Sequence, residues 1–376
     1  MRTMTRREFT AYLGGVSAVL WLPGCGLFRT GADSYSVPVL GDMHYDAFPR
    51  EKFHAKAMRL WAEKGGVHPE RIREFDRNAK MWQDLCKRIL ESSAAVRRDD
   101  AAFLLQLGDL VQGDCEDNAL HMRMLKEATD LLEGAFPGLP VVSLCGNHDV
   151  REGSDDVGAA KPYAERMIPY ESKQLAAFAP DGFASTTFGF RRGRDLWIVL
   201  DFNFGARDVG IVRRLLAENR DVRYTFVATH GPVLPMSIWE CRWFYLGSPK
   251  EDALRREMRA LFAKRQAIVL AGHVHSLELK DWYGDGGRIT EMVLNTCAGR
   301  SDGTYFPAEP QVVSEDAVTY GDWGEKDLFD EYRPGIRRYF VSRAVGHHVL
   351  HVGDDGVTLD YYGHDARVPT KSFLLR

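Results

Sequence analysis

The sequence predicts an α/β domain in which strands buried on both faces deliver polar residues to one edge of a sheet. Several apolar segments are built from Val, Leu, Ile and Phe without strict alternation, as in strands that helices cover on both sides. Five such segments run directly into Asp, Asn or His, and sites of α/β sheets form beyond the carboxyl ends of their strands. We therefore expect one active site at those strand ends.

Length and composition indicate a globular protein of ordinary size. The chain has 376 residues, of which 45% are hydrophobic and 27% charged, so it is globular rather than disordered. A formal net charge of −4 argues against a general electrostatic grip on nucleic acid, which needs a basic face. We expect a single domain over residues 34–376, with no nucleic-acid partner and no protein partner predicted.

The first 25 residues differ from the rest and read as an export signal. Arg6, Arg7 and Phe9 precede a short apolar run and resemble a twin-arginine signal, although Thr10 departs from that pattern. The run ends at Cys25 in a sequence that resembles a bacterial lipobox, which implies lipid attachment at this cysteine. The alternative is an apolar N-terminal helix that merely contains two arginines. The resemblance predicts export to the periplasm or the outer face of the membrane.

Regular elements are expected in alternation along the chain. The predicted strands cover residues 34–40, 101–107, 141–144, 224–228 and 267–270. The predicted helices cover residues 75–96, 117–132, 210–218 and 252–264, with Asp117 as an N-cap. A β-hairpin is expected over 183–202, and closing strands of the same domain over 337–362. Insertions are expected near 46–76, 151–180 and 303–334.

The five cysteines beyond Cys25 contain no Cys-x-x-Cys pair. Cysteine often behaves as a small core residue, so we expect buried free thiols. None of them lies at a position that the strand-end motifs offer to a metal, which argues against a thiolate site.

The five strand-end stretches share one property, because each presents residues that bind metal ions through oxygen or nitrogen. They are Asp42-Met43-His44, Gly108-Asp109, Gly146-Asn147-His148-Asp149, Thr229-His230-Gly231 and Gly272-His273-Val274-His275. This mixed oxygen and nitrogen set suits borderline transition metals better than magnesium or calcium. Seven ligands are too many for one ion, and a carboxylate can bridge two, so the set predicts a two-metal site.

With these motifs in order, the chain resembles the calcineurin-like metallophosphoesterase family. Any single motif is weak, but all five occur in the family's order, each after a predicted strand. The resemblance implies a two-sheet β-sandwich flanked by helices, with the active site at the carboxyl ends of the strands. It also implies two divalent transition-metal ions as cofactors, chosen among Mn, Fe, Zn, Co and Ni.

The resemblance assigns roles to individual residues. It gives Asp42, His44 and His275 to one ion, Asn147, His230 and His273 to the other, and Asp109 to both. His148 would lie near the phosphate as a general acid or transition-state stabiliser, with Asp149 orienting its imidazole. Purple acid phosphatases, which are relatives, have a tyrosine ligand and a glycine where this chain has Gln112 and His44. No tyrosinate–iron colour is therefore expected.

The expected reaction is hydrolysis of a phosphate mono- or diester by in-line attack of a metal-bridging hydroxide, outside the cytoplasm. Two divalent ions bring four positive charges against the two carboxylates, which leaves about +2 to hold hydroxide and phosphate. The alternatives are a nuclease of the same family, which the acidic balance disfavours, and a non-catalytic binding module on this fold. The second alternative is disfavoured because all seven ligand positions are filled.

Overall fold

The computed structural model describes residues 33–46, 80, 82–115, 117–151, 158–234, 249–297, 331–342 and 345–376. The predicted export signal and most of the predicted insertions at 46–76 and 303–334 lie outside these residues. In the described part of the predicted insertion at 151–180, the chain forms helix α7 (Ala160–Gln174).

The first of two sheets carries the N-terminal strands. Its order is β13-β12-β11-β1-β2-β3, with β1, β2 and β3 parallel and β11 to β13 antiparallel. The strands are β1 (Tyr35–Leu40), β2 (Leu104–Gln106), β3 (Val141–Ser143), β11 (Gly346–Gly353), β12 (Gly356–Gly363) and β13 (Lys371–Leu374). Strand β11 thus pairs with the first strand, β1, and β12 and β13 extend the sheet from there.

The second sheet has the order β10-β8-β9-β7-β6-β5-β4, in which β5, β6, β7 and β9 are parallel. Its strands are β4 (Phe188–Arg192), β5 (Asp195–Leu200), β6 (Thr225–Thr229), β7 (Ile268–Ala271), β8 (Leu277–Gly284), β9 (Gly287–Val293) and β10 (Ile336–Ser342). The predicted hairpin is β4–β5. The β8–β9 hairpin was not predicted, because charged residues in both strands mask the apolar pattern.

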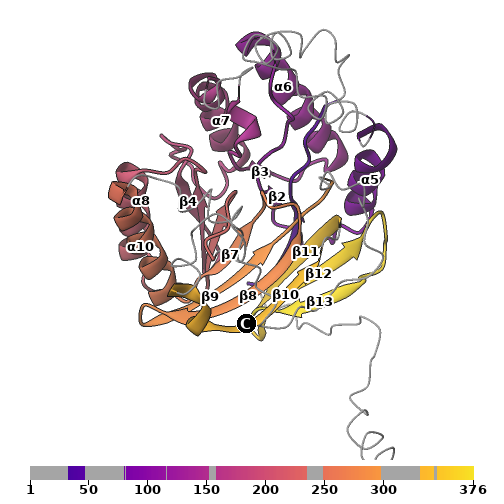
Figure 1. Ribbon diagram of the computed structural model, residues 1–376. Helices are drawn as coiled ribbons and strands as arrows, with labels where there is room; N and C mark the ends of the chain where they lie inside the picture. The colour runs from indigo at the N-terminus through magenta and orange to yellow at the C-terminus, as the bar shows by residue number, and fades with distance from the viewer. Residues whose placement is uncertain are drawn as a thin grey trace, which may run out of the picture.

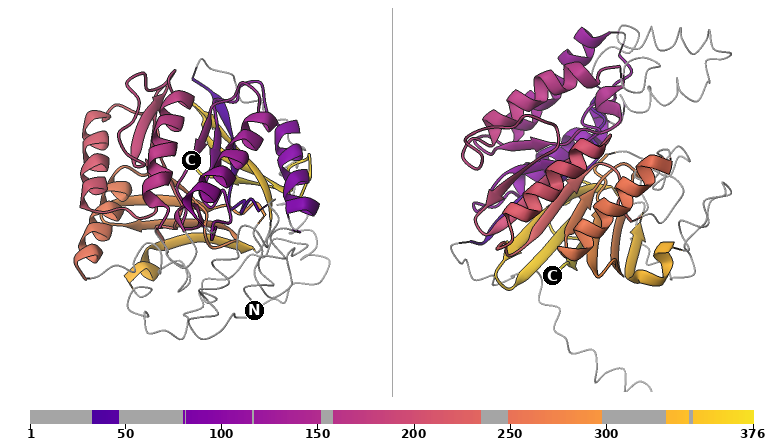
Figure 2. Two further views of the ribbon diagram at one scale, coloured as in Figure 1. Left: turned by 90° about the horizontal axis from the view of Figure 1, so that it is seen from above. Right: turned by 90° about the vertical axis from the view of Figure 1, so that its left-hand side faces the viewer.

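Helices cover the outer face of each sheet, as Figures 1 and 2 show. The first sheet packs against α5 (Lys87–Ala95), α6 (Asn118–Ala135) and α7, and the second against α8 (Ala206–Glu218) and α10 (Pro249–Lys264). Asp117 caps α6 as predicted, since its carboxylate accepts a hydrogen bond from the Leu120 N–H. No helix in the described ranges is long and apolar enough to cross a bilayer.

The main core lies between the two sheets. Val37 and Val39 of β1 point into it together with Trp197 of β5 and Phe226 of β6, whose rings stack at 4.3 Å between centroids. Leu40 instead faces the helices, because alternate residues of a strand point to opposite faces. The observed architecture confirms the predicted two-sheet sandwich flanked by helices.

The expectation of free thiols is wrong for one pair of cysteines. Cys86 and Cys297 form a disulfide across 211 positions of sequence. Sequence spacing did not show the pair, because only the fold brings the end of the π-helical turn Trp82–Cys86 beside the segment after β9. Cys115 and Cys145 are free and buried, as expected.

Candidate metal centre

The predicted ligands come from the carboxyl ends of five parallel strands. Asp42 and His44 follow β1, Asp109 follows β2, Asn147 follows β3, His230 follows β6, and His273 and His275 follow β7. The first three strands belong to one sheet and the last two to the other. The sandwich therefore joins two half-sites, one from each sheet, at one end of the molecule.

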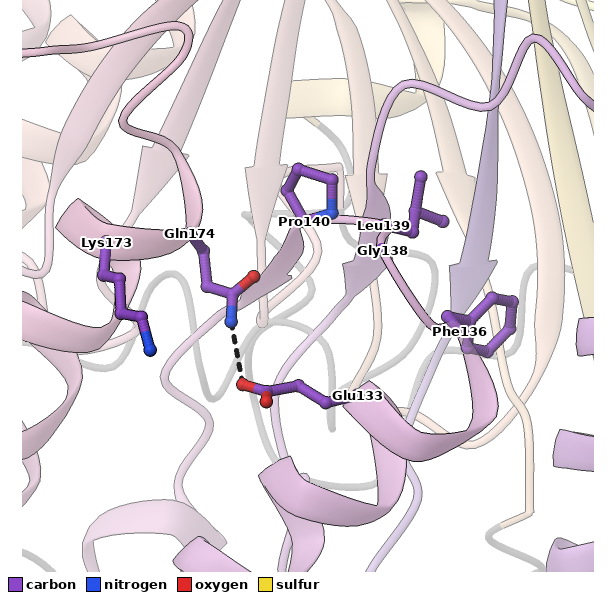
Figure 3. A pocket seen from close by; sticks show the side chains of 7 residues that line it. All are labelled: Glu133, Phe136, Gly138, Leu139, Pro140, Lys173 and Gln174. Carbon is purple, nitrogen blue, oxygen red and sulfur yellow. Dashed lines mark hydrogen bonds between the residues drawn. The ribbon is translucent and has the colours of Figure 1, made fainter.

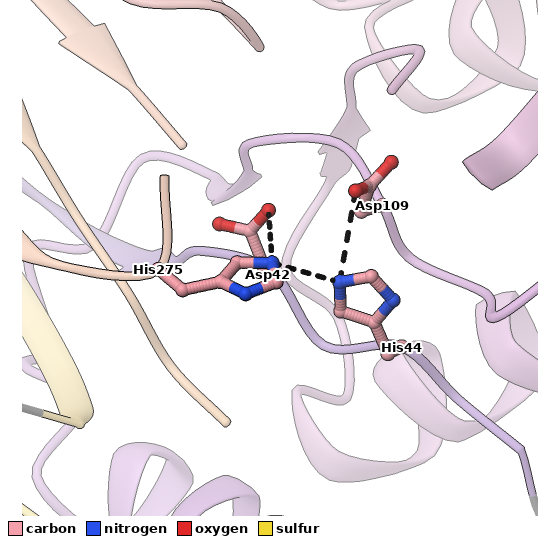
Figure 4. A group of neighbouring side chains, drawn as sticks. All are labelled: Asp42, His44, Asp109 and His275. Carbon is pink, nitrogen blue, oxygen red and sulfur yellow. Dashed lines mark hydrogen bonds and ion pairs between the residues drawn. The ribbon is translucent and has the colours of Figure 1, made fainter. Parts of the chain in front are cut away.

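The structure brings the charged and imidazole ligands into two groups that share one residue. Asp42, His44, Asp109 and His275 form the first group, which Figure 4 shows, and Asp109, His230 and His273 form the second. Within each group the potential ligand atoms lie within 4.8 Å of one another. The family resemblance implied the same grouping of these residues, and their assignment to two ions stays a prediction.

The two oxygens of Asp109 have different surroundings. Oδ1 accepts a hydrogen bond of 2.8 Å from the backbone N–H of His148. Oδ2 lies 3.6 Å from Nε2 of His44 and 3.3 Å from Nε2 of His230, so it faces both groups at once. The backbone thus fixes the carboxylate while one oxygen stays directed between the two groups.

Two histidines have a tautomer set by hydrogen bonds on their far side. Nδ1 of His230 donates to the Leu107 carbonyl at 2.8 Å, and Nδ1 of His44 lies 3.2 Å from Oε1 of Gln112. In the neutral form of each ring, Nε2 then carries a lone pair toward the centre, the arrangement by which outer partners orient metal-binding histidines. Gln112 occupies the position at which purple acid phosphatases have a tyrosine ligand, and the sequence did not predict its contact with His44.

Potential ligand atoms face one another around these imidazoles. Nε2 of His230 lies 3.1 Å from Nδ1 of His273 and 3.2 Å from Oδ1 of Asn147, and Nε2 of His44 lies 3.2 Å from Nε2 of His275. Lone pairs at such distances repel unless a proton or a cation lies between them. The donor set, oxygen and nitrogen without sulfur, is the one that borderline divalent metals prefer. The residues therefore fit two such ions.

The backbone at the site is held in an uncommon conformation. Four of the seven predicted ligands, His44, Asp109, His273 and His275, have φ between 48° and 73°. Residues other than glycine rarely adopt this left-handed region, and it persists where surrounding structure enforces it, often at functional sites. The strained turns aim side chains from the strand ends into the centre.

Glycine is required at Gly146 because two chain segments touch there. A Cβ on Gly146 would lie 2.3 Å from Oδ1 of Asp109 and 2.2 Å from its backbone nitrogen. Any larger residue would push the loop that carries Asn147 away from the shared carboxylate. The glycine of this motif thus serves close packing.

Buried charge favours cation binding. Burial raises the pKa of Asp42 to about 7, an effect that His230 opposes and Asp109 reinforces. Burial and then the charge of Asp109 likewise raise the pKa of Asp149 to about 7. Burial also opposes ionisation of Asp109, yet the imidazoles of His230 and His148 hold the pKa of its carboxyl well below the usual range. Positive charge at the centre would stabilise all three carboxylates in their ionised forms.

The expected contact between Asp149 and the His148 imidazole is not formed. The Asp149 carboxylate accepts hydrogen bonds from the Gly146 N–H at 2.8 Å and the Val111 N–H at 3.1 Å. Nδ1 of His148 instead donates to the Gln112 carbonyl at 2.7 Å. Asp149 thus shapes the loop, because its short side chain reaches backbone donors before it can reach the ring. Gln112 orients the imidazole.

A buried ionic network also holds the His230 loop. The Lys280 ammonium lies 2.9 Å from a Glu278 oxygen, 3.3 Å from Glu291 and 2.8 Å from the Leu234 carbonyl, with its side chain fully buried. Glu291 accepts hydrogen bonds from the backbone N–H groups of Val233 and Leu234. Sequence analysis did not predict this network, because alternating charges in a strand usually face solvent.

The family model for calcineurin-like phosphoesterases matches residues 36–277, more than half of the chain. The chain belongs to the calcineurin-like phosphoesterase family. As a member it is a metal-dependent phosphoric ester hydrolase, which confirms the expected enzyme class. No curated protein matches the sequence.

Several solved structures are similar to this chain at low sequence identity. A dimetal phosphatase from Danio rerio is 11% identical, with a TM-score of 0.52, over 91% of this chain and 99% of that one. A structure titled PhoD is 11% identical, with a TM-score of 0.47, over 94% of this chain and 69% of that one. GAP50 of Plasmodium, described as an anchor in the inner membrane complex, is 12% identical, with a TM-score of 0.46, over 91% and 89%. At 11% identity the likeness to the Danio rerio phosphatase concerns the fold alone.

We expect the Asp109→Asn variant to lose metal at both positions. The amide keeps the shape of the side chain but removes the charge of the one carboxylate that faces both groups. Elemental analysis of purified wild-type protein should give two transition-metal ions per chain, and the variant fewer than one. Asp221→Asn, an exposed carboxylate paired with Arg191, is the matched control and should keep both ions. Full occupancy in Asp109→Asn would contradict the shared role.

We expect the Lys280→Met variant to be less stable by about 3–5 kcal/mol, because it leaves two buried carboxylates without their cation. Urea unfolding measures the loss. Arg213→Met, which removes the exposed pair with Glu257, should cost less than about 1 kcal/mol. Equal effects of the two substitutions would show that the buried network does not stabilise the fold.

Proposed function

We propose that this phosphoesterase hydrolyses a phosphate mono- or diester at a dinuclear transition-metal centre held by Asp42, His44, Asp109, Asn147, His230, His273 and His275. The observation that carries the proposal is the position of Asp109, whose Oδ2 faces both ligand groups. Two bound divalent ions would supply a nucleophile derived from water at neutral pH and would polarise the phosphoryl oxygens.

The chain's own residues provide the rest of the chemistry. Asp109 sets the distance between the two groups, and the hydrogen bonds of His44 and His230 on their far sides keep their Nε2 atoms directed inward. The His148 ring lies 4.5 Å from the His44 ring, at the edge of the first group. This position supports a role for His148 beside the phosphate.

His148 has one nitrogen available for proton transfer. Because Nδ1 donates to the Gln112 carbonyl, Nε2 is the atom that accepts a proton and passes it to the leaving oxygen. Burial and then the nearby Arg151 guanidinium lower the pKa of His148 well below its ordinary value. An anionic phosphate beside the ring favours the protonated form, so the acid forms when substrate is bound.

Activity of metal-loaded protein lacking residues 1–25 tests the proposal. We expect hydrolysis of aryl phosphates, loss of activity with a chelator, and recovery with manganese, zinc, cobalt, nickel or iron. His148→Ala should lower kcat by about 10²–10⁴-fold while leaving the metal content unchanged. His364→Asn, which alters a histidine at the turn after β12, is the matched control. No turnover across a panel of monoesters and diesters would overturn the proposal.

We also propose that the enzyme acts outside the cytoplasm, exported by its twin-arginine segment and attached to a membrane through lipidated Cys25. The Cys86–Cys297 disulfide supports this location, because disulfides persist mainly in oxidising compartments. Arg6→Lys/Arg7→Lys should retain the protein in the cytoplasm, and Cys25→Ser should release it from the membrane fraction. Fractionation of cells that express each variant measures both effects, and unchanged distributions would exclude this route.

A further inference from the structure

Two pockets differ in their relation to the metal centre. The larger, about 310 Å³, lies between α6 and α7 and is lined by residues including Glu133, Pro140 and Gln174, as Figure 3 shows. It sits at the start of β3, whereas Asn147 follows the end of that strand. The smaller pocket, about 190 Å³, lies between α7, the start of α8 and the carboxyl end of β5. Only the smaller one lies at the ligand-bearing end of the strands.

The smaller pocket adjoins the metal centre. Cys145 and Val150 line it, and these residues flank the loop that carries Asn147 and His148. Phe202 also lines it, and its ring lies 6.3 Å from the His230 ring in an edge-to-face arrangement. One aromatic ring thus lines the pocket and also packs against a predicted metal ligand.

The lining combines polar groups with apolar walls. The polar side chains are Ser185, Thr186, Asp201, Asn203, Arg207 and Asp208, and the walls include Tyr163, Ala160 and Ala164. Two carboxylates against one guanidinium disfavour a second anion here. Carboxylates accept hydrogen bonds from hydroxyl groups, while hydroxyl and amide side chains both donate and accept them.

Hydrogen bonds hold both the side chain and the backbone of Asp201. One of its oxygens accepts a 2.8 Å hydrogen bond from the Asn203 N–H, and its own N–H donates to Oγ1 of Thr187 at 3.1 Å. Burial raises the pKa of its carboxyl. Asp208, in contrast, caps α8 by accepting from the Gly205 N–H. A carboxylate has about four acceptor positions, so Asp201 retains capacity for a ligand.

We infer that this pocket binds a hydroxyl-bearing group, a polyol or sugar, of the ester whose phosphate lies at the metal centre. The inference rests on the proposed function and deepens it by naming a substrate class. The volume is below the roughly 300–1,000 Å³ of sites for whole small molecules, so it suits one part of a substrate. Tyr163 and Phe202 offer apolar surface to the carbon face of such a group.

Asp201→Asn tests the pocket with metal-loaded protein. The amide keeps the shape but loses the charge, so kcat/KM for glycerol phosphate should fall about 10- to 100-fold, as expected for a hydrogen bond to a charged group. With p-nitrophenyl phosphate, whose leaving group carries no further hydroxyl, the change should stay within about 2-fold. Ala164→Leu fills the pocket without removing a polar group and should also reduce the preference for glycerol phosphate. Asp221→Asn is the exposed control.

The outcomes separate this inference from the proposed function. If the wild type hydrolyses neither compound, the proposed function fails. If it hydrolyses both, and both pocket variants leave the ratio of kcat/KM values unchanged, the pocket inference is overturned while the function stands. A loss confined to ethanolamine phosphate in Asp201→Asn would show that the pocket binds a cation, which also overturns the inference.

Discussion

The shared carboxylate of Asp109 is the constraint on which the rest of the site depends. Its Oδ1 is fixed by the His148 N–H, and its Oδ2 is 3.6 Å from His44 and 3.3 Å from His230. Each ligand group takes residues from both sheets, with Asp109 from one sheet and His230 and His275 from the other, so both groups depend on how the sheets pack at this end. Packing of the sandwich core therefore controls the geometry of the chemistry.

Several layers of contact hold Asp109 and the loops around it. The Gly146 backbone touches Asp109 with no room for a Cβ, and the Asp149 carboxylate ties the same loop to Val111. On the opposite sheet, Glu291 and Lys280 hold the segment after His230. Left-handed conformations at four ligands show that the surrounding contacts outweigh local backbone preference. A site assembled in this way is preorganised before any ion binds.

The pocket beside the metal centre depends on the same packing of the two sheets. It forms where the carboxyl ends of β3 and β5 face each other across the sandwich, beside the loop with Asn147. Both its polar lining and its proximity to His230 follow from the two-sheet arrangement. A substrate group in this pocket and a phosphate at the metals would be positioned by one rigid frame.

The sequence by itself determined the ligand set and its strand-end placement, because each motif is local and follows a continuous apolar segment. It also predicted the cap of α6 at Asp117 and the two-sheet class through family resemblance. Only the tertiary structure decided which groups meet. The Gln112 carbonyl, not Asp149, orients His148, Cys86 pairs with Cys297, and Lys280 lies buried between two glutamates. The His148 contact runs through a backbone atom, the cysteines lie far apart in the sequence, and the burial of Lys280 depends on what the fold packs over its strand. None of these leaves a periodic or spaced signal in the sequence.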